Sequence, residues 1–235
     1  MKRICLILFS ALILAGCSKD HSEEIARLDD FWEQTKEGSD DPIIFPTEIG
    51  LVKWEAIDGL DQRFRICQVP DNILEYKTTK ALGLSILHYP MNYLILAYNY
   101  YDMPVTLVCE RSSLHKALAA RPDAAEVLTG IFETTSIDKD PGLVFAKSYE
   151  KITVCDELFL EYFLGSGFVK GLDTGSNKER LKAAVARKRD ERLADVDLNG
   201  VLTLIPLAYM SERLGLGVRF SDDIVNTMHQ FTQND

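Results

Sequence analysis

The stretch from Thr78 to Pro90 reads TTKALGLSILHYP and decides the fold class. Its apolar side chains recur three and four positions apart, which predicts a helix from Thr78 to His88. Pro90 ends this helix, because proline cannot continue the helical hydrogen-bond ladder and holds the preceding residue in an extended conformation.

The same pattern, interrupted only by short turns, continues toward the C-terminus. Further helices are expected over residues 91–101, 104–120, 122–133, 148–164, 176–193, 202–214 and 221–230. A capping box, Ser176 to Glu179, is predicted to begin the helix over 176–193. The helix over 148–164 is predicted to bury one stripe, formed by Ile152, Cys155, Phe159 and Phe163. The prediction is an all-α fold of about nine helices stacked as hairpins, because short connections make neighbouring helices antiparallel or steeply crossed.

The segment before Pro70 is less regular. Residues 43–57 are compatible with irregular structure or a short hairpin, and residues 58–67 with a short helix capped by Asp58 or with a strand. After residue 16, the predicted organisation is a linker with a short helix over 17–41, an irregular segment over 42–69 and a helical domain over 70–235.

Composition excludes several classes of protein. Hydrophobic residues make up 46% of the 235 residues, too many for a disordered chain. The net charge of −10 argues against nucleic-acid binding, which needs a basic face to neutralise phosphates.

The N-terminus has the anatomy of a signal peptide. Lys2 and Arg3 precede an uncharged run over residues 4–15, which is too short for a transmembrane helix. The next residues, Leu14-Ala15-Gly16-Cys17, resemble the lipobox of bacterial lipoproteins. That resemblance implies cleavage before Cys17, which makes residues 1–16 a signal peptide. It also implies acylation of the Cys17 thiol, which makes residues 17–41 a lipidated N-terminus and linker. Ser18, directly after the cysteine, resembles the signal for outer-membrane sorting, so the anchor is expected in the outer membrane.

Cleavage before Cys17 leaves 219 residues and changes the net charge from −10 to −12, since Lys2 and Arg3 are removed. Three further cysteines remain, Cys67, Cys109 and Cys155, and we expect them to pack as small buried side chains. The acidic segment after Cys17 leaves two orientations open, the periplasmic face and the cell surface.

A second resemblance covers residues 64–133. Its elements are Cys67-Gln-Val-Pro70-Asp71, His88-Tyr89-Pro90, Tyr98-Asn99 and Leu118-Ala-Ala-Arg121-Pro-Asp123-Ala124. They resemble a group of uncharacterised helical bacterial lipoproteins. The chain departs from that group at residues 100–103, where the group often has a longer glycine-containing stretch. The resemblance implies a helical fold and no assigned chemistry.

The turn from Asp195 to Gly200 resembles the first half of a calcium-binding EF-hand loop. Asp195, Asp197, Asn199 and Thr203 are the candidate ligands. Pro206 stands where the loop should end in a bidentate glutamate, so affinity should be weak. The alternative is a plain polar turn between two helices. No other cofactor is expected.

Two other features are candidate binding surfaces. Tyr93, Tyr98, Asn99, Tyr100 and Tyr101 could stack on a glycan or belong to the core. The helix over 176–193 is strongly basic and could meet lipid head groups or an acidic partner. The alternative is a solvated face with a buried stripe formed by Leu181, Ala184, Val185 and Leu193.

No sequence pattern of a known catalytic site is present, and neither His88 nor His115 has an evident partner. The expected function is therefore a non-enzymatic, lipid-anchored scaffold or binding module at the outer membrane. Glycan or peptide binding is the alternative, and a hydrolase without a recognisable motif is a third.

Overall fold

The computed structural model describes residue 28 and residues 30–33, 38–46, 57, 59–98, 100, 102–137, 154–195, 198 and 200–232. They belong to two compact units, Met1–Lys36 and Glu37–Asp235. In the first unit, residues 28 and 30–33 are helical, and the rings of Phe31 and Trp32 meet edge to face with 5.0 Å between centroids. Apart from Cys17, the candidate sites belong to the second unit.

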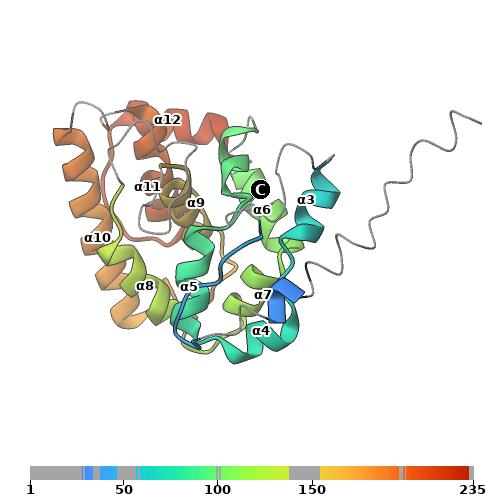
Figure 1. The fold of residues 1–235 in the computed structure, drawn as a ribbon. Coiled ribbons are helices and arrows are strands. Elements are labelled where there is room, and N and C mark those ends of the chain that lie inside the picture. The colour runs from blue at the N-terminus through green and yellow to red at the C-terminus, as the bar shows by residue number, and fades with distance from the viewer. Residues whose placement is uncertain are drawn as a thin grey trace, which may run out of the picture. The chain divides into compact units, whose positions relative to one another are not determined.

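Helices form the second unit, and its described residues include no β-strand (Figure 1). The helices are α3 (Leu60–Ile66), α4 (Asp71–Tyr76), α5 (Thr79–Leu87), the 3-10 helix η2 (Asn92–Leu96), α6 (Asp102–Arg111), α7 (Ser113–Ala119), α8 (Ala124–Thr134), α9 (Val154–Gly165), α10 (Gly175–Ala194), α11 (Val201–Arg213) and α12 (Asp222–Phe231). The predicted all-α class is confirmed. Within the described ranges, no helix combines the length and hydropathy needed to cross a membrane.

Helix α9 is buried on all sides and lies at the centre of this unit. It packs against α5, η2, α6 and α11 (Figure 1). Every residue from Cys155 to Gly165 is buried. The prediction of a single buried stripe is therefore wrong, since side chains all round the helix are enclosed. Ile152, the first residue of that stripe, lies outside the described residues.

Helix α5 has the boundaries that its sequence predicts. The Thr78 hydroxyl caps it by accepting a hydrogen bond from the Ala81 amide at 3.2 Å. The early segment packs on this helix, because the Ile43 amide donates to the Ser85 hydroxyl at 2.8 Å. Residues 38–46 therefore share a core with the helices.

Of the two alternatives for residues 58–67, the structure has the helix, α3. Its N-cap is Gly59, whose φ of 81° lies in the left-handed region that favours glycine. Asp58, the predicted cap, lies outside the described residues.

The prediction of one helix over residues 91–101 is wrong. Among the described residues of this stretch, 91–98 and 100, the helix is η2, which ends at Leu96. The buried Asn92 side chain turns inward and donates to the carbonyls of Ile86 and Leu87 at 2.9 and 3.3 Å, closing the end of α5. An asparagine that binds the preceding backbone in this way competes with regular helix formation.

The prediction of one helix over residues 104–120 is also wrong, since α6 ends at Arg111 and α7 begins at Ser113. Ser112 lies between them with extended backbone angles, and its hydroxyl accepts a hydrogen bond from the His115 amide. A buried serine in this position acts as an N-cap and starts a new helix.

Helix α10 begins two residues earlier than the predicted capping box. Its N-cap is Thr174, and Ser176 is an exposed residue inside the first turn. Gly175 takes a φ of 54°, so the chain enters the helix through a left-handed glycine. The capping-box prediction is wrong for this reason.

Candidate functional site

Four charged side chains form a closed cluster between α9 and α10, here named the charge ladder: Glu157, Glu161, Lys188 and Arg192. All four are at most 3% exposed. Lys188 Nζ donates to Glu157 Oε1 at 2.6 Å, and the Arg192 guanidinium donates to both oxygens of Glu161 at 2.6 and 3.0 Å. Arg192 Nη2 also lies 3.2 Å from Glu157 Oε1. The ladder therefore joins two helices through buried ion pairs.

The cations of the ladder also reach the backbone of two further elements. Lys188 donates to the Thr135 carbonyl at the end of α8, and its Nζ lies 4.8 Å from the centre of the Phe132 ring. Arg192 donates to the Thr203 carbonyl in the first turn of α11. These bonds satisfy donors that burial would otherwise leave unpaired.

Burial perturbs one carboxylate of the ladder, that of Glu161. It raises the pKa of Glu161 to about 7, and the nearby Glu157 carboxylate acts in the same direction. The Arg192 guanidinium opposes this shift because it favours the ionised carboxylate. Glu157 Oε2 is buried without a hydrogen-bond partner among the described residues.

The ladder changes the interpretation of the basic helix. Lys188 and Arg192 point into the core, whereas Leu193, predicted to be buried, is 47% exposed. The remaining predicted stripe, Leu181, Ala184 and Val185, is buried. Of the solvent-side arginines, Arg180 binds Glu133, Arg187 binds Glu191 and Arg189 binds Asp190. Much of the positive charge expected to face a lipid or acidic partner is therefore neutralised within the molecule.

A second enclosed polar group surrounds His115. Its Nδ1 lies 2.9 Å from the Ser112 hydroxyl, and the rings of Tyr89, Phe159 and Phe163 surround it edge to face at 4.9 to 5.5 Å. Burial lowers the pKa of His115 to about 3, so the ring is neutral. Ser112 is 0% and His115 1% exposed. This serine and histidine are within bonding distance, but a substrate has no access to them.

Cys67, Cys109 and Cys155 are all buried, and none of them forms a disulfide among the described residues. Burial raises the pKa of Cys109 far above its ordinary value. They fill space in the core, as expected for small apolar side chains.

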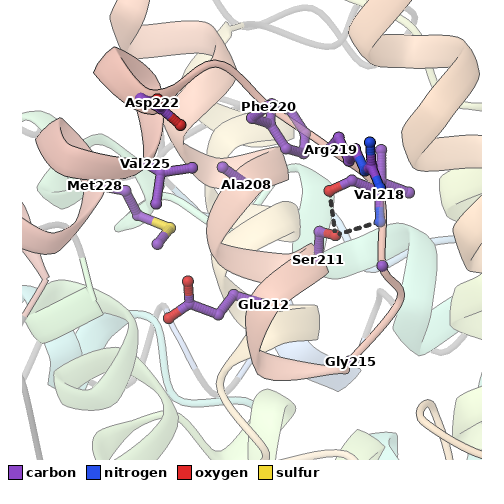
Figure 2. A pocket seen from close by; sticks show the side chains of 11 residues that line it. Ala208, Ser211, Glu212, Gly215, Val218, Arg219, Phe220, Asp222, Val225 and Met228 are labelled. Carbon is purple, nitrogen blue, oxygen red and sulfur yellow. Dashed lines mark hydrogen bonds between the residues drawn. The ribbon is translucent and has the colours of Figure 1, made fainter.

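An open groove lies between α11 and α12, with a volume of about 560 Å³ (Figure 2). Ala208 and Glu212 of α11 face Val225 and Met228 of α12 across it. The third wall is the segment from Gly215 to Phe220. This space is here named the wider groove.

A narrower groove of about 310 Å³ lies beside it and shares the wall formed by Arg219 and Phe220. Its apolar lining consists of Leu193, Leu204 and Ile224 as well as Phe220. Both volumes fall in the range of ligand pockets in proteins.

The predicted calcium turn lies between α10 and α11, as expected. Asp197 and Asn199 lie outside the described residues, and Asp195 is the C-cap of α10. The Thr203 hydroxyl donates to the carbonyls of Leu198 and Gly200, which closes the turn. Gly200 is the N-cap of α11 with an extended φ of −123°. Calcium binding stays a prediction.

The predicted tyrosine cluster is divided. Tyr93 is half-buried, and its hydroxyl accepts a hydrogen bond from Arg63 at 2.6 Å. Tyr98 is half-buried and Tyr100 is 42% exposed, while Asn99 and Tyr101 lie outside the described residues. A pocket of about 360 Å³ beside α6 is lined by Tyr209 rather than by these tyrosines. Glycan binding stays a prediction.

Sequence reasoning missed the ladder and both grooves. The ladder had a usable signal: two glutamates four residues apart in a largely apolar helix, and a lysine and an arginine four residues apart in another. Equal spacing of opposite charges allows pairing side by side. The grooves had no such signal, because they depend on how α12 is placed against α11.

No protein-family model, curated protein or solved structure matches this chain.

Proposed function

We propose that the mature protein is a non-enzymatic binding module that is anchored in the outer membrane through Cys17 and holds a protein partner in the wider groove. The lipobox Leu14-Ala15-Gly16-Cys17 supports the anchor. The groove supports the binding role.

The observation that carries this proposal is a contrast: the side chains with shifted pKa values are enclosed, whereas the open groove is largely apolar. A catalytic site needs titratable groups with shifted pKa values in an accessible cleft. Here burial shifts the pKa values of Glu161 and His115, and both are fully enclosed. The open space is instead the groove, whose walls are largely apolar, as is typical of protein-binding surfaces.

The anchor is tested by metabolic labelling with palmitate. We expect label in the wild-type protein and none in Cys17→Ala, together with loss of Cys17→Ala from the outer-membrane fraction. Equal labelling of the two proteins would refute the anchor.

The binding role is tested with a library of random peptides displayed on phage and selected on the purified mature chain. Peptides that occupy the groove should bind the wild type and lose binding to Val225→Glu, which places a charge on the apolar wall. Asn226→Glu is the matched control, because it adds the same charge on the same helix at an exposed residue outside the groove lining. Failure to select any peptide that distinguishes Val225→Glu from Asn226→Glu would refute the binding role.

A further inference from the structure

The wall shared by the two grooves carries a cation without an ionic partner. Arg219 is exposed, and within the described ranges its guanidinium forms no ion pair. Of the neighbouring charged groups, Arg189 pairs with Asp190 at 2.8 Å, and Glu212 lies 3.0 Å from His229 Nε2, a contact that is ionic only when the histidine is protonated. Asp222, across the wider groove in Figure 2, lies in the first turn of α12, where the helix dipole stabilises a negative charge. Arg219 is therefore the cation of this wall that is available to a partner.

This wall is held in place from two sides. The Ser211 hydroxyl of α11 accepts a hydrogen bond from the Val218 amide and donates to its carbonyl, both at 3.2 Å (Figure 2). On the other side, Arg189 of α10 donates to the Arg219 carbonyl at 2.7 Å. A recognition element that is fixed before binding loses less conformational entropy when the partner arrives.

Apolar surface lies on both sides of this wall, whose backbone is held in place. Val225 and Met228 line the wider groove, and Leu204 and Ile224 line the narrower one. An arginine recognises a carboxylate through paired, charge-assisted hydrogen bonds. A partner complementary to this surface thus carries a carboxylate between two apolar side chains.

We propose that the occupant of the grooves is a segment of a partner protein in which an acidic residue is flanked by large apolar residues. The carboxylate binds Arg219, and the apolar side chains enter the grooves on either side of Phe220. This inference rests on the proposed binding role of the wider groove and adds the chemistry of the partner.

The test uses the peptides selected on the wild-type protein. We expect them to share an aspartate or glutamate between apolar residues. Their affinity, measured by fluorescence anisotropy, should fall about tenfold or more in Arg219→Ala, the loss expected for a hydrogen bond to a charged group. Arg65→Ala is the matched control, since Arg65 is an exposed arginine on α3 outside both grooves.

Charge reversal gives a second measurement. A peptide whose acidic residue is changed to lysine should bind Arg219→Glu more tightly than it binds the wild type. If selected peptides lose binding to Val225→Glu but are unaffected by Arg219→Ala, the acidic partner is refuted and the binding role stands. If no peptide depends on Val225, the binding role itself is refuted.

Discussion

Replacing Arg192 by leucine should destabilise the protein more than any exposed charge substitution. Arg192 binds both oxygens of Glu161, approaches Glu157 and donates to the Thr203 carbonyl. Its removal leaves the Glu161 carboxylate, which is 0% exposed, without its cation. Removing one partner of a buried ion pair costs about 3–5 kcal/mol, a large share of the roughly 5–15 kcal/mol that stabilises a typical domain.

The double substitution Glu161→Leu/Arg192→Leu should recover much of this loss. It removes both charges and leaves the Glu157–Lys188 pair, whose Nζ–Oε1 distance is 2.6 Å, in place. Replacing a buried pair by apolar side chains of similar volume is often close to neutral. The coupling free energy between the two positions should be about 2–3 kcal/mol, the upper part of the range for residues in direct contact.

The assay is urea unfolding of the purified mature chain, followed by circular dichroism at pH 8, where Glu161 is ionised. The control is Arg187→Leu, which removes an exposed arginine paired with Glu191 four residues away and should cost about 0.3–0.5 kcal/mol through that pair. The reasoning would be refuted if Arg192→Leu cost no more than Arg187→Leu, or if the double substitution were as destabilising as both single ones together.

Four further predictions follow from the buried groups. The pKa of Glu161 is raised from 4.5 to about 7, so its contribution to stability is complete below pH 4.5 and is lost as pH rises through 7. The loss is about 3 kcal/mol at most. Glu161→Gln should make the midpoint of urea unfolding less dependent on pH between pH 5 and 8. The pKa of His115 is lowered from 6.5 to about 3, so its contribution to stability is complete above pH 6.5 and falls by at most about 5 kcal/mol toward pH 3. His115→Asn should remove that acid sensitivity. An unchanged midpoint of acid unfolding in this variant would contradict the neutral ring. The buried thiols of Cys67, Cys109 and Cys155 should resist maleimide in the native protein and should all react in urea. Mass spectrometry should then show three maleimide adducts. A fourth adduct would show that Cys17 is not acylated. A Cβ on Gly165 would lie 2.8 Å from the Tyr209 ring and 3.1 Å from the Met210 backbone. Gly165→Ala should therefore lower the free energy of unfolding in urea by about 1–3 kcal/mol. Gly200→Ala, which has open space around it, should cause no such loss.

The sequence predicted helix boundaries correctly where the residues that start and stop the helix stand next to it in the chain. Thr78 and Pro90 frame α5, because a hydroxyl cap and a missing amide act within a few residues. The predictions over 91–101 and 104–120 failed where a buried side chain bound the backbone. Asn92 closes α5, and Ser112 starts α7.

Helix α10 shows why the candidate sites were harder to predict. In sequence its basic residues resemble a solvated face. Lys188 and Arg192 are nevertheless buried, because α9 presents Glu157 and Glu161 at the same four-residue spacing. Burying a charge is costly unless a counter-charge lies beside it. Here each cation and its glutamate are 31 residues apart in the chain, so local sequence does not reveal the pair.

The sequence by itself determined the helical class, the positions of most turns and the expectation of a lipid anchor at Cys17. Each depends on interactions within a few neighbouring residues. The tertiary structure decided which polar groups are enclosed and where the surface opens. The charge ladder and the two grooves are made by side chains from different helices, so they exist only once α9 to α12 have packed together.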